Sequence, residues 1–116
     1  HGGVILLHGT GGSGLSIFAA AAALGLHVAL AARGFRLLAP DAPLRRFGLW
    51  GDEQVRVWFD RRRVNDNDVR DDVNDVDAAC CKLQALVDET GGQVFVVGFS
   101  TGGAMALHAA TLVRGL

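Results

Sequence analysis

The 116-residue sequence has no excess of charge of either sign. Its 11 basic and 12 acidic residues leave a net charge of -1, so electrostatics gives no reason to expect nucleic acid or an acidic membrane as a partner. It also lacks an apolar run of about 18 residues with the flanks of a membrane span. The longest apolar stretch, Ile17 to Ala32, is interrupted by Gly25 and His27. We interpret that stretch as a buried helix.

Cysteine is scarce, because only the adjacent Cys80 and Cys81 are present. Neighbouring cysteines rarely form a disulfide, and the chain has no C-x-x-C motif. We therefore expect both to be small core residues in a reducing compartment, the cytoplasm. No signal peptide is visible, although the chain begins at His1 rather than at Met. Length and the hydrophobic share of 50% predict one globular domain over residues 1–116.

Apolar runs and helical patterns alternate along the chain. The pattern predicts a strand at 4–7, a helix at 15–32, a strand at 35–39, a helix from Val69, a strand at 93–97 and a helix to about Val113. The second of these helices is indicated by apolar residues spaced alternately by four and three, at Val69, Val73, Val76, Cys80, Leu83 and Val87. This βαβαβα order predicts an α/β fold, a parallel sheet between two helix layers (α/β/α).

The segment from Leu44 to about Asp68 has no clean period. A connection of that length is usually a functional loop or a covering flap. Its aromatic residues include Trp50, Trp58 and Phe59. We expect Trp58 and Phe59 to contact substrate in an acyl groove, and simple packing is the alternative for all three.

The most informative motif is G-x-S-x-G at Gly98 to Gly102. It follows a buried strand and opens a helix, the context in which a serine hydroxyl is held on a sharp turn above the sheet edge. Ser100 is therefore the candidate nucleophile. A serine nucleophile also needs a base and N–H donors for the oxyanion. The N–H of Thr101 is the first donor that we expect.

The glycine-rich loop at Gly9 to Gly14 follows the first strand and should supply the second donor. Our candidate is the N–H of Thr10, and Gly9 and Gly11 let the backbone approach the substrate. The same loop also satisfies G-x-G-x-x-G, the dinucleotide fingerprint. However, Asp41 lies beyond the usual offset of about 20 residues, and a dinucleotide site leaves the serine turn unexplained.

These motifs together resemble α/β-hydrolases of the phospholipase/carboxylesterase group, which includes acyl-protein thioesterases and lysophospholipase-like proteins. The resemblance rests on VILLHGTGGSG, APDAP, VWFD and VGFSTGGAMALH, in that order. It implies serine hydrolysis of carboxylic esters or acyl thioesters, with acylated proteins or lysophospholipids as substrates and with no metal or organic cofactor. It also implies a structural role for His8. The family usually has glutamine where this chain has Thr101.

One part of the hydrolase pattern is absent. In this fold the acid and the base follow the serine along the chain, yet Thr101 to Leu116 contain no aspartate. We therefore predict the N-terminal half of a hydrolase domain, whose triad Asp and His lie beyond the chain end, and no turnover by these residues alone. The alternatives are a non-catalytic hydrolase-like fragment that binds an acyl ligand or a partner, and a dinucleotide-binding module.

Overall fold

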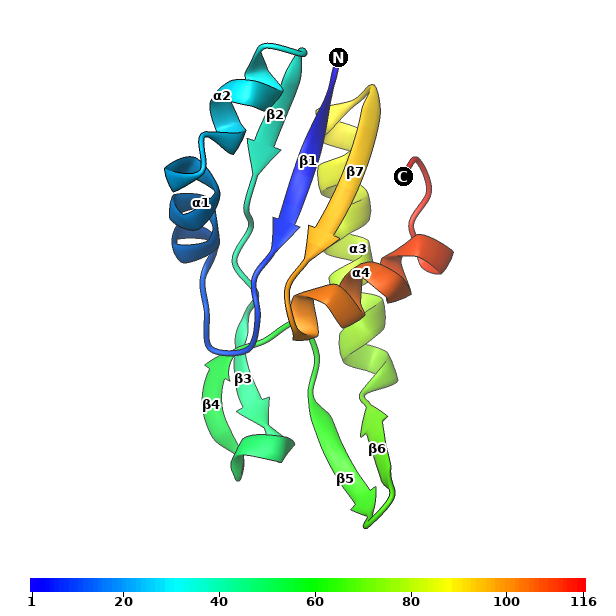
Figure 1. The fold of residues 1–116 in the computed structure, drawn as a ribbon. Coiled ribbons are helices and arrows are strands. Elements are labelled where there is room, and N and C mark those ends of the chain that lie inside the picture. Colours follow the sequence, from blue (N-terminus) through cyan, green and yellow to red (C-terminus); the bar gives the residue numbers. More distant parts are fainter.

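A computed structural model describes residues 1–116, and a three-stranded parallel sheet of order β2-β1-β7 forms its centre (Figure 1). Its strands are β1 (Gly2–Leu7), β2 (Phe35–Leu38) and β7 (Gln93–Gly98). β1 pairs with β7 over its whole length, with Leu7 opposite Gly98. The glycine-rich loop and the serine turn therefore leave the sheet side by side at its carboxyl edge, which is where α/β sheets bind ligands.

Helices cover both faces of the sheet, as the sequence predicts (Figure 1). One side carries α1 (Gly14–Ala23) and α2 (Leu26–Ala31), and the other carries α3 (Val73–Thr90) and α4 (Thr101–Leu112). The core lies mainly on the side of α3 and α4. It includes Ile5, Leu7, Trp58, Phe59, Val76, Cys80, Leu83, Val94 and Met105. The α/β/α prediction is confirmed.

The single helix predicted over 15–32 is wrong in two respects. The chain leaves the helical conformation at Leu24, and Gly25 takes φ +73°, a left-handed conformation that glycine adopts without strain. Two short helices result, and they are mostly exposed, because only Gly14 and Ala21 of α1 and no residue of α2 are buried. Leu24 and Val28 are 87% and 64% exposed. An alanine-rich run has no polar face, so its sequence does not indicate which side packs or whether any side does.

The segment predicted as an irregular connection instead forms two antiparallel hairpins. Their elements are β3 (Leu44–Phe47), the 3-10 turn η1 (Gly48–Trp50), β4 (Glu53–Arg56), β5 (Arg61–Asn65) and β6 (Asp68–Asp71). Val69 belongs to β6 and not to the following helix. That helix begins at Val73, because Asp72 caps it by accepting the N–H of Asp75 at 2.9 Å.

Several apolar side chains at β7 are exposed to solvent. Phe95, Val97 and Phe99 project from β7 and its end with 47%, 52% and 71% exposure. The outer strands β2 and β7 each have one unpaired edge. Of the two free cysteines, Cys80 is a core residue as predicted and Cys81 is exposed. None of the helices combines the length and the apolar character required to cross a bilayer.

Candidate functional site

Ser100 stands alone between β7 and α4, in a backbone conformation that few residues adopt. Its φ is +57° and its ψ is −121°, and apart from Asp52 it is the one non-glycine residue with positive φ. Such a conformation costs about 1–3 kcal/mol and persists only where the surroundings impose it. The strain lifts the serine out of the strand and presents it, exposed, at the start of α4.

The two glycines of the motif are required by close backbone contacts. A Cβ on Gly98 would overlap the carbonyl oxygen of Gly102. A Cβ on Gly102 would overlap the carbonyl oxygens of Leu7 and His8, at the end of the neighbouring strand. The chain reverses so tightly around the serine that neither position has room for a side chain.

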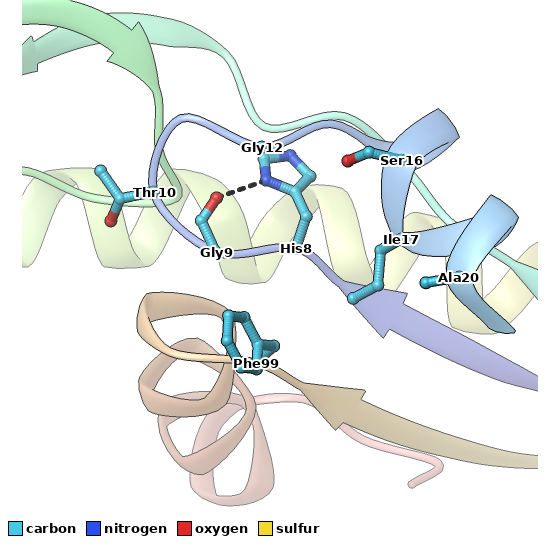
Figure 2. Close-up of a pocket in the computed structure, with 8 residues that line it drawn as sticks. All are labelled: His8, Gly9, Thr10, Gly12, Ser16, Ile17, Ala20 and Phe99. Atoms are coloured by element: carbon cyan, nitrogen blue, oxygen red, sulfur yellow. Dashed lines mark hydrogen bonds between the residues drawn. The ribbon is translucent and has the colours of Figure 1, made fainter.

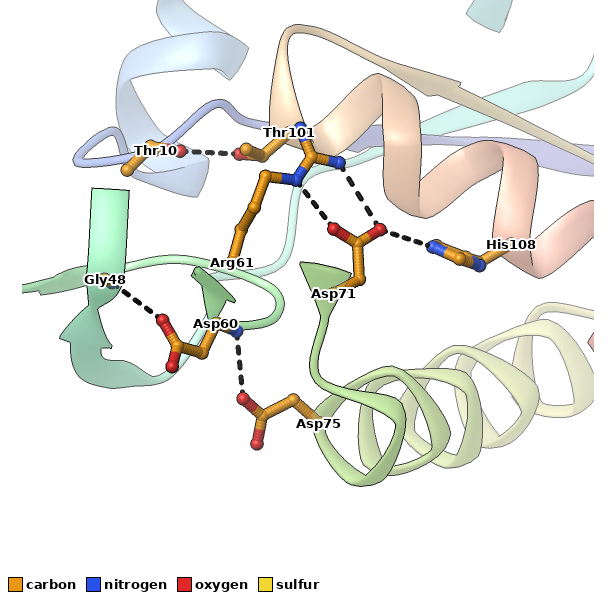
Figure 3. Close-up of polar contacts among 8 residues, drawn as sticks. All are labelled: Thr10, Gly48, Asp60, Arg61, Asp71, Asp75, Thr101 and His108. Atoms are coloured by element: carbon orange, nitrogen blue, oxygen red, sulfur yellow. Dashed lines mark hydrogen bonds and ion pairs between the residues drawn. The ribbon is translucent and has the colours of Figure 1, made fainter. Parts of the chain in front are cut away.

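The glycine-rich loop lies directly against this turn. A Cβ on Gly9 would be 3.2 Å from the Ser100 Cβ. The hydroxyl groups of Thr10 and Thr101 are 2.8 Å apart and form a hydrogen bond between the two loops (Figure 3). Neither the Thr10 nor the Thr101 backbone N–H donates to an acceptor within the chain. The structure therefore brings two free N–H groups close to one serine.

His8 holds the glycine-rich loop in place. Its Nε2 accepts the N–H of Ala42 at 3.0 Å, so its proton resides on Nδ1, which donates to the Gly9 carbonyl at 2.8 Å. The His8 carbonyl in turn accepts the indole N–H of Trp58 at 2.9 Å. The ring is only 2% exposed. Both ring nitrogens are occupied, so His8 has a structural role and is not positioned as a base for Ser100.

A pocket of about 270 Å³ lies beside the serine. Its lining residues are Gly9, Thr10, Phe47, Leu49, Trp50, Arg61, Phe99, Ser100 and Thr101. Four of the predicted site residues thus line one cavity, namely Gly9, Thr10, Ser100 and Thr101. Gly11 is one residue removed from it. Its φ of +77° and its hydrogen bond to the Arg56 carbonyl at 2.8 Å set the curvature of the loop.

Trp58 and Phe59 are found in the core and not in this pocket. They are 1% and 0% exposed, and Trp58 packs against the His8 ring with a centroid separation of 5.2 Å. Their contact with substrate therefore stays a prediction without support from their placement. The apolar wall of the pocket comes instead from Phe47, Leu49 and Trp50 at the tip of the first hairpin. Of these three, only Trp50 is a candidate from the sequence. The sequence does not show that Phe47 and Leu49 lie at a hairpin tip, because the segment has no strand pattern.

A second, larger cavity of about 430 Å³ opens between the glycine-rich loop and α1 (Figure 2). Ile17 and Ala20 of α1 form one wall, and Phe99 faces them from the end of β7. His8, Gly9, Thr10, Gly12 and Ser16 complete the lining. The cavity adjoins the uncovered face of β7, so its outer boundary is open in these residues.

Arg61, Asp71 and His108 form a connected row of polar side chains, and Arg61 also lines the serine pocket (Figure 3). Arg61 donates from Nε and Nη2 to the Asp71 carboxylate at 2.7 and 3.4 Å, and Asp71 also contacts His108 Nε2 at 3.0 Å. Burial raises the pKa of Asp71, but the hydrogen bonds from Arg61 and His108 outweigh it and hold the pKa below its usual value. His108 is thus a hydrogen-bonded residue of α4.

Asp60 fixes the connection between the two hairpins. Its carboxylate accepts the Gly48 N–H at 2.8 Å, and its own N–H donates to Asp75 at 2.9 Å (Figure 3). The residue thereby anchors the tip that carries Trp50 and the start of β5 in one arrangement. Asp60 is thus an acceptor that fixes this connection, and it does not line the serine pocket.

The start of α1 is arranged unlike a dinucleotide site. The Asp41 carboxylate accepts the Gly14 N–H at 2.7 Å, and the Ser13 hydroxyl accepts the Ser16 N–H at 3.1 Å. These acceptors occupy the helix N-terminus to which a pyrophosphate would bind. The chain also forms no group of three His, Cys, Asp or Glu side chains able to hold a metal ion.

Comparison with known proteins agrees with this geometry. The Phospholipase/Carboxylesterase family matches residues 1–115, and the chain belongs to that family. Mouse lysophospholipase-like protein 1 is 33% identical over 113 residues, which are 92% of this chain and 46% of the mouse protein. The chain thus spans about half the length of this curated relative.

Solved structures show the same fold. Acyl-protein thioesterase 2 of Zea mays superposes with a TM-score of 0.78 and 28% identity, over 95% of this chain and 46% of the maize protein. Arabidopsis thaliana SOBER1 superposes with a TM-score of 0.75 and 25% identity, over 97% of this chain and 55% of its own. The residues described here correspond to the N-terminal half of the α/β-hydrolase fold, and the family is one of phospholipase/carboxylesterase-type hydrolases.

Proposed function

We propose that Ser100 is the nucleophile of a serine hydrolase that cleaves carboxylic esters or acyl thioesters. The observation that carries this proposal is the strained turn of Ser100, at φ +57°, beside the unpartnered N–H groups of Thr10 and Thr101. Strain of this kind is retained at functional sites. An oxyanion requires N–H donors of this kind, and both residues line the same pocket as the serine.

The reaction proceeds in two steps. The Ser100 Oγ attacks the acyl carbonyl carbon, its proton passes to a base, and the carbonyl oxygen becomes an oxyanion that the N–H groups of Thr10 and Thr101 stabilise. The bond to the leaving alcohol or thiol then breaks, the leaving group takes the proton, and an acyl-enzyme remains. Water attacks the acyl-enzyme in the same way and releases the carboxylic acid and free Ser100.

We further propose that the base and its orienting acid, a His and an Asp, come from outside residues 1–116. The imidazoles of His8 and His108 are both hydrogen-bonded within the chain, His8 to Ala42 and Gly9 and His108 to Asp71. The chain covers 46% of its mouse relative, which leaves room for further strands in a full-length protein. The domain at 1–116 is then one half of a catalytic domain, and these residues alone are inactive.

The family limits the substrate to esters, thioesters or lipids. The names of the relatives suggest an acylated protein, as for the maize thioesterase, or a lysophospholipid, as for the mouse protein. We propose a cytoplasmic location, because Cys80 and Cys81 are both free and adjacent. Cell fractionation that finds the full-length protein in a secretory compartment would contradict that location.

The test is steady-state hydrolysis of a short-chain nitrophenyl ester by the full-length protein and its Ser100→Ala variant. Loss of the nucleophile in a comparable triad costs on the order of a millionfold in kcat, so Ser100→Ala should reduce turnover to background. Ser16→Ala is the matched control, because it removes an exposed α1 hydroxyl outside the serine pocket. It should retain wild-type kcat.

Two results would contradict the proposal. Undiminished turnover by Ser100→Ala would place the chemistry elsewhere. Absence of turnover in the wild type, combined with binding of a long-chain acyl ligand, would favour the non-catalytic alternative. Residues 1–116 expressed alone should give no turnover, and measurable hydrolysis abolished by Ser100→Ala would show that they contain a working base.

A further inference from the structure

Arg61 is the only charged residue that lines the pocket beside Ser100. It begins β5, two residues after the buried Phe59, and its side chain is 29% exposed. The guanidinium carbon Cζ lies over the Phe59 ring, 5.3 Å from its centroid. This stacking, together with the contact to Asp71, holds the cation in one orientation beside the nucleophile.

Asp71 accepts hydrogen bonds from only part of the Arg61 guanidinium. A guanidinium has five N–H groups, and Asp71 takes one from Nε at 2.7 Å and one from Nη2 at 3.4 Å. The second contact is long, and the carboxylate oxygen that accepts it also binds His108 at 3.0 Å. No atom of the chain accepts a hydrogen bond from Nη1. Arg61 therefore retains donors for a second anion.

The rest of the pocket lining is uncharged, so Arg61 is the one lining residue that would attract an anion. Phe47, Leu49 and Trp50 make one wall apolar, and no carboxylate lines the pocket. The Asp71 carboxylate contacts Arg61 from outside the lining and offsets part of its charge. Hydrogen bonds between a guanidinium and an oxyanion are about twice as strong as neutral ones. The neighbouring Arg62 and Arg63 do not line the pocket and are exposed.

We propose that Arg61 is a specificity-determining residue that selects esters or thioesters carrying an anionic group, a carboxylate, phosphate or sulfonate, beside an apolar portion. The anion sits on Arg61 while the scissile carbonyl lies between Ser100 and the N–H groups of Thr10 and Thr101. The proposal rests on the proposed function, because it assumes that Ser100 performs the chemistry. It assigns Arg61 to substrate binding and leaves the proton transfers to other groups.

The experiment compares matched substrate pairs with the full-length protein. In the first arm, the nitrophenyl monoester of glutaric acid is compared with nitrophenyl pentanoate, so the anion is on the acyl side. In the second arm, a butyrate ester whose nitrophenyl ring carries a carboxylate is compared with nitrophenyl butyrate. The anion is then on the leaving group. The measured quantity is the ratio of kcat/KM for the anionic substrate to that for its neutral partner.

Arg61→Gln should lower this ratio about tenfold in at least one arm, mainly through KM, because the variant loses a charge-assisted hydrogen bond. The arm that responds identifies the side on which the anion lies. Arg61→Lys should give an intermediate ratio, since it keeps the charge without the planar fork. Arg63→Gln, a matched change in the same hairpin but outside the pocket, should leave both ratios unchanged.

Arg61→Gln leaves the Asp71 carboxylate without its cation, which disturbs the fold as well as the pocket. The double variant Arg61→Gln/Asp71→Asn separates the two effects, because it removes that carboxylate too. The double variant should show the same lowered ratio. If both variants keep the wild-type ratio in both arms, Arg61 serves only the fold and the proposal is overturned. Failure of the proposed function gives a different result, namely hydrolysis of the neutral esters that survives Ser100→Ala.

Discussion

Replacement of Gly102 by alanine should damage the fold and the site together. A Cβ at this position would overlap the carbonyl oxygens of Leu7 and His8, which belong to the end of β1 and to the loop after it. Rotation of a side chain cannot relieve an overlap with backbone atoms. The start of α4 or the end of β1 must therefore move, and overpacking of this kind typically costs about 1–3 kcal/mol or more.

Gly103→Ala provides the matched control in the same helical turn. Its Cβ would be 3.2 Å from the Gly98 carbonyl, a contact that a shift of a few tenths of an ångström relieves. Alanine in a helix gains up to about 1 kcal/mol over glycine, and this gain applies to both variants. The difference between the two variants therefore isolates the collision at Gly102. We expect it to be about 2 kcal/mol or more.

Urea denaturation of the full-length variants measures that difference as a free energy of unfolding. The rate of labelling by a serine-directed fluorophosphonate measures the effect on the site. Movement of α4 displaces the Thr101 N–H next to Ser100, so Gly102→Ala should also label more slowly than Gly103→Ala. Equal unfolding free energies for the two variants would refute the argument that close backbone contact excludes a side chain at Gly102.

Three further outcomes are expected. Thr10→Val removes the hydroxyl contact with Thr101 but keeps the backbone N–H, so fluorophosphonate labelling should slow less than tenfold, whereas loss of an oxyanion donor costs about 100-fold or more. His8→Ala removes a buried ring with two hydrogen bonds, and urea unfolding should show a loss of about 2–4 kcal/mol. The folded-state pKa of Asp71 lies below its ordinary value of 3.8, so its charge stabilises the fold above that pH and the contribution is lost as the pH falls through the lowered pKa. Asp71→Asn should therefore lose less free energy of unfolding than the wild type on acidification through that range.

The elements nearest the serine are the ones that the sequence predicts well. A continuous apolar run followed by G-x-S-x-G leaves few alternatives to a buried strand, a sharp turn and a helix. The sequence leaves open which strands are neighbours, and the structure pairs β1 with β7, which brings Thr10 to Thr101. Local pattern and global fold agree here, and for that reason the predicted strands and the turn at Ser100 correspond to the structure.

The two hairpins could not be predicted in the same way. Arg61 to Asn65 and Asp68 to Asp71 are rich in charge, so no apolar face marks them as strands. Their register comes from an Asx turn in which the Asn65 side chain accepts the Asn67 N–H at 3.0 Å. Val69 continues the helical spacing by coincidence, and the Asp72 cap overrides that spacing.

The sequence also does not predict which aromatic residues are buried. Trp58 and Trp50 are eight positions apart in the same connection, yet one is 1% exposed and the other 48%. The difference arises from tertiary contacts, because Trp58 donates to the His8 carbonyl while Trp50 lies at the hairpin tip. Arg61 likewise belongs to a run of three arginines, and the sequence does not show that it alone of the three lines the serine pocket.

The most direct test of the account is to find which residue of the full-length protein a fluorophosphonate modifies. The account predicts a single adduct, located by peptide mass spectrometry on Ser100, and its loss in Ser100→Ala but not in Ser16→Ala. An adduct on another residue, or none on a protein that hydrolyses esters, would contradict the assignment of Ser100 as nucleophile.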